Sequence, residues 1–252
     1  TFDDNGGNDT IFLNVETNNT NISTANTTDV DKIALASGVD ATMTRAQNAV
    51  IDGAAGDNTV TLTDAGTATG DANVETYVLA AGAQTFTLGG AAQNVTANST
   101  GGNGLITIDT STLTSVTGTF DDNGGNDTIK LNVQGGNVDI KDVVMTDVDN
   151  ISLDTDAGAT MTRAQHAKLN AAAGTNTITL SDAGTLTGDA NVETYVLAAG
   201  AQTFTLGATG QNVTANSTGG SGEIQIDTDT LTSITGTFDD NGGNDTIKLN
   251  VE

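Results

Sequence analysis

The stretch FDDNGGNDTI, residues 120–129, occurs three times in this chain of 252 residues. The copies begin at Phe2, Phe120 and Phe238, so that each starts 118 residues after the one before it. A regular period of this length is typical of repeat architectures, in which each unit buries its apolar face against its neighbours. The chain is therefore a tandem array.

The repetition extends through the whole period. Residues 64–89 return as residues 182–207 with a single change, Ala68 to Leu186. The array divides into repeat 1 (residues 1–118), repeat 2 (residues 119–236) and the start of a third repeat (residues 237–252). Because both ends fall at the same phase of the period, we expect the chain to be a segment of a longer array.

Most of the period consists of short segments in which apolar and polar residues alternate, separated by Gly, Asn and Asp. The strands expected from this pattern cover residues 10–15, 31–35, 59–63, 75–79, 85–88, 94–96, 105–109, 115–120 and 128–133. Short, closely spaced strands favour an all-β fold, a β-solenoid resembling a parallel β-helix, whose coils stack on one another. The alternative is a series of tandem β-sandwich modules.

A Thr-x-x-Gln motif interrupts the strand pattern once in each repeat, at residues 44–47 and 162–165. This motif has the form of a capping box, in which the Thr hydroxyl and the Gln amide satisfy free backbone N–H groups at a helix start. It predicts one short helix per repeat, running through Ile51 or Leu169 and ending near the next glycine, Gly56 or Gly174.

The composition excludes several classes of function. The chain has 32 acidic and seven basic residues and a net charge of −25, which disfavours nucleic acid as a partner and favours divalent cations. It has no cysteine and therefore no disulfide, thiolate metal site or cysteine nucleophile. Aromatic residues make up only 3%, so we expect a core of Val, Ile, Leu, Ala and stacked Thr. No apolar run is long enough to span a membrane.

The repeated acidic loop carries the strongest chemical signal. In each copy, three carboxylates and two Asn side chains surround a Gly pair. Calcium prefers a shell of hard oxygen ligands, which a tight loop of Asp, Asn and backbone carbonyls supplies. The alternative is a polar turn without a metal. The candidate calcium ligands are Asp3, Asp4, Asn5, Asn8 and Asp9, then Asp121, Asp122, Asn123, Asn126 and Asp127, and then Asp239, Asp240, Asn241, Asn244 and Asp245.

Two further carboxylates per repeat are candidate calcium ligands. They are Asp29 and Asp31 in repeat 1 and Asp147 and Asp149 in repeat 2. Residues two apart in a strand share one face. Two placements remain open: each pair meets the acidic loop of a neighbouring coil and completes a metal site, or it lines a solvated edge.

Catalysis finds little support in the sequence. The only histidine, His166, is replaced by Asn48 in the other repeat, so a function shared by the repeats does not require it. Paired carboxylates acting on a sugar also need basic or aromatic groups that hold the substrate, and these are scarce. We therefore expect no enzyme. A carbohydrate- or surface-binding module is the alternative, for which the chain offers Tyr77 and Tyr195.

Two stretches of the sequence resemble known bacterial proteins. Gly124-Gly125-Asn126-Asp127-Thr128-Ile129 resembles a shortened form of the calcium-binding nonapeptide of the repeats-in-toxin family, without its third glycine. The stretches MTRAQ (residues 43–47) and VETYVLA (residues 74–80) resemble the long repeats of giant bacterial surface adhesins and S-layer-like proteins. The resemblance implies secretion, an extracellular or cell-surface location, calcium at Asp121 and Asp127, and a structural or adhesive role.

The sequence thus predicts a structural repeat of a long extracellular bacterial surface protein or filament, such as an adhesin stalk, a sheath or an S-layer. We expect calcium to make it rigid and the repeats to stack on one another. The expected partners are neighbouring copies of the same repeat and possible surface glycans.

Overall fold

The computed structural model describes residue 2 and residues 10–97, 104–215, 222–228, 231–241 and 245–251. The fold is all-β, with parallel strands stacked as a β-solenoid and very little helix. This confirms the predicted solenoid, because sandwich modules would pair their strands antiparallel. The chain forms two compact units: unit 1 comprises residues 1–131 and 142–149, and unit 2 comprises residues 132–141 and 150–252.

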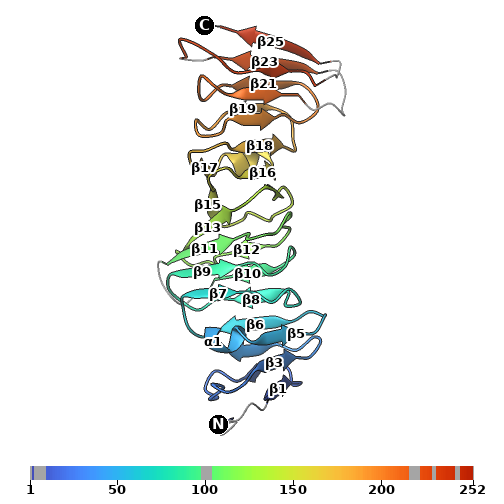
Figure 1. Cartoon of the computed structure of the whole chain (residues 1–252), viewed down its shortest axis with the longest axis vertical. Coiled ribbons are helices and arrows are strands. Elements are labelled where there is room, and N and C mark those ends of the chain that lie inside the picture. The colour runs from blue at the N-terminus through green and yellow to red at the C-terminus, as the bar shows by residue number, and fades with distance from the viewer. Residues whose placement is uncertain are drawn as a thin grey trace. The chain divides into compact units, whose positions relative to one another are not determined.

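In unit 1, each inner strand of a sheet pairs with a strand of the preceding coil and with a strand of the following coil. One sheet has the order β12-β10-β8-β6-β4-β2, another has the order β1-β3-β5, and β7, β9 and β11 pair in a third. Figure 1 shows β7, β9 and β11 in successive layers, as it does β6, β8 and β10. The elements are β1 (Phe12–Val15), β2 (Thr20–Asn21), β3 (Lys32–Leu35), β4 (Ala41–Met43), α1 (Arg45–Asn48), β5 (Ile51–Gly53), β6 (Thr59–Leu62), β7 (Thr67–Thr69), β8 (Thr76–Val78), β9 (Gln84–Thr87), β10 (Asn94–Thr96), β11 (Leu105–Asp109) and β12 (Phe120–Asp121).

Unit 2 is built in the same way. Its sheets have the orders β14-β16-β18-β20-β22-β24 and β19-β21-β23-β25, and β15 pairs with β17. The elements are β14 (Asn137–Asp139), β16 (Gly158–Met161), α2 (Arg163–His166), β17 (Leu169–Ala171), β18 (Thr177–Leu180), β19 (Thr185–Thr187), β20 (Thr194–Val196), β21 (Gln202–Thr205), β22 (Asn212–Thr214), β23 (Glu223–Asp227), β24 (Phe238–Asp239) and β25 (Thr246–Asn250). Strands β13 (Thr128–Val133) and β15 (Val148–Leu153) contribute residues to both units.

The units are not the predicted repeats, because their boundaries fall within β13 and β15. The division into residues 1–118, 119–236 and 237–252 stays a prediction from the sequence. Equivalent contacts nevertheless recur at that interval. Arg45 Nε donates to Asp64 at 3.1 Å, and Arg163 Nε donates to Asp182 at the same distance.

The core follows from the alternation of residues along each strand. In β6, Val60 and Leu62 point inward and are buried, while Thr59 and Thr61, which alternate with them, face outward. The predicted core of Val, Ile, Leu, Ala and Thr is only part of the observed one, because aromatic side chains are also fully buried. Tyr77 and Phe86 are fully buried, with ring centroids 4.7 Å apart, and such a pair adds packing energy beyond its buried area.

The predicted helix start is confirmed and the predicted helix end is wrong. Gln47 donates its backbone N–H to the Thr44 hydroxyl, and Thr44 donates its own to the Gln47 side chain, which is a capping box. The helix stops at Asn48, because Ile51 starts a strand that pairs with Ile33 of β3. Helix α2 likewise ends at His166, and neither helix reaches the expected glycine. Burial in a parallel sheet thus outweighs continuation of the helix.

Buried amides join one coil to the next. Gln93 is 2% exposed and accepts the Gly89 N–H through Oε1 at 2.7 Å. Its Nε2 donates to the carbonyls of Asp71 at 2.5 Å and Val74 at 2.9 Å in the preceding coil. Gln211 makes the equivalent contacts in unit 2. Because buried backbone groups need partners, these side chains satisfy the backbone where the coil turns between sheets.

Candidate functional site

Three carboxylates from two successive coils of unit 1 lie close together. Asp121 ends β12, Asp122 follows it, and Asp147 directly precedes β15. Each offers an oxygen, and these oxygens all lie within 4.8 Å of one another. We call these three residues the acidic cluster. All three side chains are half-buried.

The register of the coils places Asp147 beside the other two. Thr119 and Val144 form a parallel bridge, and Val144 donates its backbone N–H to the Gly118 carbonyl at 3.2 Å. The chain therefore runs alongside the start of β12 shortly before it reaches Asp147. Of the two placements left open by the sequence, Asp147 takes the one in which it meets the acidic loop.

The glycine-rich turn positions the other two carboxylates. Asn123 donates its backbone N–H to Asp121 at 2.6 Å, and Gly124 donates to Asp122 at 2.9 Å. Asn123 and Gly124 both have positive φ, 56° and 72°, a conformation that Asn and Gly tolerate best. The turn thus holds the two neighbouring carboxylates in place through its own backbone.

Crowding changes the acidity of Asp147. Desolvation, the charge of Asp122 and a side-chain hydrogen bond with Asp121 raise the pKa of Asp147 above its ordinary value. Like charges held close together disfavour ionisation. A cation bound by all three carboxylates would remove this cost.

Four of the other described candidate carboxylates accept backbone N–H groups of an adjacent coil. Asp127 accepts the Gly104 N–H and Asp149 accepts the Ile129 N–H, at 2.8 and 2.9 Å. Asp31 and Asp245 do the same for Ile11 and Gly222. These side chains join adjacent coils and are not part of the acidic cluster. Asn126 is exposed, and Asn123 contributes its backbone to the turn.

The remaining candidates belong to the other copies of the loop. Asp239 accepts the Asn241 N–H at 2.8 Å, as Asp121 does for Asn123, and Asp240 follows β24 on the surface. Asp29 is the repeat 1 equivalent of Asp147. Asp3, Asp4, Asn5, Asn8, Asp9 and Asn244 lie outside the described residues.

The two tyrosines considered for sugar binding are buried. Tyr77 and Tyr195 are both 0% exposed, and their hydroxyls accept the backbone N–H groups of Asp71 and Asp189. Burial raises the pKa of both phenols well above the ordinary value. Neither ring is available to a ligand, so the carbohydrate hypothesis loses the residues on which it was based.

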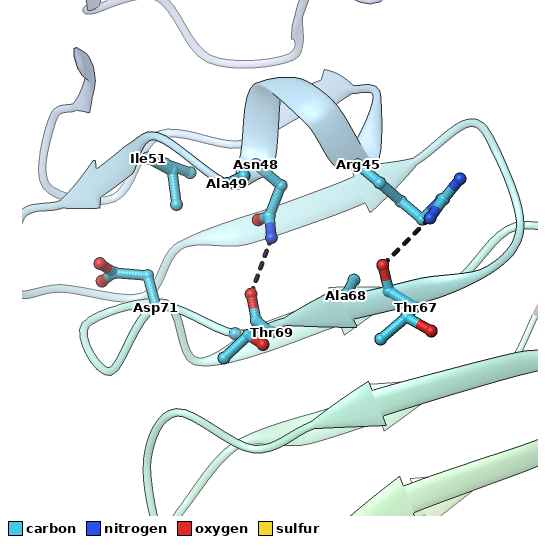
Figure 2. Close-up of a pocket in the computed structure, with 9 residues that line it drawn as sticks. Arg45, Asn48, Ala49, Ile51, Thr67, Ala68, Thr69 and Asp71 are labelled. Atoms are coloured by element: carbon cyan, nitrogen blue, oxygen red, sulfur yellow. Dashed lines mark hydrogen bonds between the residues drawn. The ribbon is translucent and has the colours of Figure 1, made fainter. Parts of the chain in front are cut away.

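Sequence reasoning missed a hollow between α1 and β7. It has a volume of about 410 Å³ and is lined by Arg45, Asn48, Ala49, Ile51 and residues 67–71. Figure 2 shows Arg45 and Asn48 reaching from the helix to the carbonyls of β7. The signal in the sequence was indirect: Ala68 and Asn48 are smaller than Leu186 and His166, their counterparts in the other repeat.

The chain matches no protein-family model, no curated protein and no solved structure. Within the described ranges, no helix has the length and apolar character needed to cross a bilayer. The fold and the cluster together define the class: a parallel β-solenoid in which carboxylates from two successive coils lie close together.

Proposed function

We propose that this chain is a structural repeat segment of a long extracellular bacterial surface protein or filament, made rigid by calcium and assembled by stacking of its repeats. The adhesin stalk, the sheath and the S-layer are the settings in which such a segment serves. The observation that carries the proposal is the meeting of Asp121, Asp122 and Asp147 within 4.8 Å.

The solenoid supports a mechanical role. Strands within each unit hydrogen-bond along the stacking direction, and rows of buried apolar side chains follow the same direction. In solenoids, stability grows with the number of stacked units and their interfaces. A segment of this kind serves as a spacer, and it needs no catalytic group.

The acidic cluster supports calcium as the cation. Calcium is bound by carboxylates, carbonyls and water in flexible geometries, and three carboxylates are a donor set of that kind. Asp147 belongs to a later coil than Asp121 and Asp122, so an ion bound to all three would join two coils. The same three residues recur in repeat 1 as Asp3, Asp4 and Asp29.

Calcium binding would also link folding to location. An apo cluster carries uncompensated repulsion, whereas a bound ion contributes its binding free energy to the folded state. Folding would then be favoured outside the cell, where calcium is abundant, which fits the extracellular location that we propose. Neighbouring repeats remain the proposed partners. Surface glycans are not supported by the buried tyrosines.

Thermal unfolding of the purified chain in calcium, in magnesium and in chelator tests this proposal. We expect calcium to raise the melting temperature, and Asp147→Asn to abolish most of this increase. Asp57→Asn is the matched control, because Asp57 is exposed and distant in sequence from the cluster. An equal calcium effect in both variants, or no calcium effect in the parent chain, would contradict the role of the cluster.

Assembly has a separate test. Electron microscopy of the purified chain in calcium should show particles associated end to end, and chelator should reduce their length. Single particles under both conditions would remove the stacking of separate chains from the proposal and leave the calcium site untouched.

A further inference from the structure

The hollow between α1 and β7, which we call the helix-edge hollow, lies at the end of a sheet. β7 is the terminal strand of its sheet, and its carbonyls at Thr67 and Thr69 face the helix. Arg45 Nη1 donates to the first at 3.1 Å and Asn48 Nδ2 to the second at 2.8 Å. As Figure 2 shows, these two side chains span the space between helix and strand and leave an opening beside them.

One buried atom in this hollow has no partner. Asn48 is 3% exposed, and its Oδ1 is buried without a hydrogen-bond partner in the described part of the chain. Leaving a buried polar atom unpaired costs about 1–3 kcal/mol. This unsatisfied acceptor of a lining residue lies just behind the surface of the hollow, so the groups that a ligand can contact directly are the more exposed ones beside it.

The rest of the lining determines the class of ligand. Asp71 adds a second, half-exposed acceptor, and it accepts the Asn73 N–H through one oxygen. Arg45 adds a donor: its Nε and Nη1 are used by Asp64 and Thr67, and Nη2 has no partner among the described residues. An anion would be repelled by Asp71, and an ammonium ion by Arg45. Hydroxyl groups donate and accept, so they satisfy both.

The apolar part of the lining completes the match. Ala49, Ile51 and Ala68 present aliphatic carbon between the polar groups. A volume of about 410 Å³ is at the lower end of the range for small-molecule sites. We propose that the helix-edge hollow binds one neutral sugar ring, with its hydroxyls on Asp71 and Arg45 and its C–H face on the aliphatic residues.

The second repeat provides a natural comparison. There Leu186 takes the place of Ala68, and His166 takes the place of Asn48. His166 Nε2 lies 2.9 Å from the Tyr195 hydroxyl, so the polar atom at this position has a partner. The larger side chains leave less room for a ligand, and the polar atom of His166 already has a hydrogen-bond partner. The site is therefore expected in repeat 1 and not in repeat 2.

Saturation-transfer NMR on the complete chain tests the proposal, with glucose, galactose, mannose and N-acetylglucosamine as probes. We expect transfer to at least one of them, and a shift of the Asn48 side-chain amide signal on titration. Methyl glycosides and disaccharides of the responding sugar separate a free monosaccharide from the end of a glycan. Chelator is present throughout, so the outcome does not depend on calcium.

Ala68→Leu is the decisive variant, because it copies the residue that repeat 2 already accommodates. It should keep the melting temperature and lose the transfer signal. The double variant His166→Asn with Leu186→Ala should gain a second site for the same sugar. No transfer to any of the four sugars, or transfer that Ala68→Leu leaves unchanged, would overturn the proposal.

Discussion

Nε2 of His166 lies 2.9 Å from the phenolic oxygen of Tyr195, inside the core of unit 2. The Tyr195 oxygen accepts the Asp189 N–H at 2.6 Å, and the hydroxyl hydrogen can donate to Nε2 when that nitrogen is unprotonated. A neutral imidazole with its proton on Nδ1 fits this arrangement. Burial lowers the pKa of His166 below its ordinary value, and the charge of Asp189 opposes this in part.

Stability should therefore fall at mildly acidic pH. Above about pH 6.5 the histidine is neutral in both the folded and the unfolded chain. Below that value the unfolded chain binds a proton that the folded chain does not bind, until the lowered folded pKa is reached. The free energy of unfolding should decrease by at most about 1.4 kcal/mol per pH unit in this window. Urea unfolding between about pH 7 and pH 5 measures it.

His166→Asn is the control for this pH effect, since Asn48 occupies the same position in repeat 1. The variant should show a smaller decrease over the same window. Equal pH dependence in both proteins would assign the effect to other groups.

Asp147→Asn should raise the melting temperature in chelator at neutral pH. The raised pKa of Asp147 means that ionisation costs free energy in the folded state, and an amide avoids that cost. Asp57→Asn, which changes the same charge at an exposed position, should have a smaller effect. Calorimetry of both variants checks this, and a lower melting temperature for Asp147→Asn would contradict repulsion in the cluster.

Gly118→Ala should destabilise unit 1 severely, by about 3 kcal/mol or more. Gly118 is buried, and an added Cβ would overlap the Gln93 carbonyl of the preceding coil. Gly136→Ala is the matched change, because a Cβ there meets nothing within 4 Å. It should alter stability by no more than about 0.5 kcal/mol. Chemical denaturation measures the free energy of unfolding of both variants. A loss for Gly118→Ala as small as that for Gly136→Ala would show that the coil shifts to make room for the methyl group.

Gln93→Leu should cost about 2 kcal/mol or more, because the Gly89 N–H and the Val74 carbonyl lose the Gln93 side chain, whereas the Asp71 carbonyl keeps the Val74 N–H. Gln225→Leu serves for comparison. Gln225 is half-buried and donates to the Asp227 carboxylate. Water can replace this donor, so Gln225→Leu should cost less than Gln93→Leu. Guanidinium unfolding curves of both variants provide the measurement. A loss below about 1 kcal/mol for Gln93→Leu would mean that water forms the hydrogen bonds that the Gln93 side chain had made to the backbone.

Much of the fold could be predicted from local patterns. The expected strands over residues 94–96, 105–109 and 128–133 are the observed β10, β11 and β13. The two-residue strand β2 (Thr20–Asn21) is too short to show a period, and only the last residue of the expected strand 115–120 lies in β12. Such segments become strands because a neighbouring coil pairs with them, which local sequence does not reveal.

The candidate site was predictable only in part. The tight loop around the glycine pair indicated that Asp121 and Asp122 would lie close together, but the position of Asp147 depends on the bridge between Thr119 and Val144. That bridge joins two successive coils, and the pattern within either segment does not show which residues pair. The same limit applies to the helix-edge hollow, which results from the early end of α1 and the placement of β7 beneath it.

The parallel pairing has a consequence for how the chain acquires its structure. Val78 of β8 pairs with Thr61 before it and Thr96 after it, so the partners of a strand are always in the adjoining coils. Short sequence separations favour rapid folding, and here the separation does not grow with the length of the array. A chain that emerges gradually from a narrow exit can thus complete each coil in turn, using the previous one as its template.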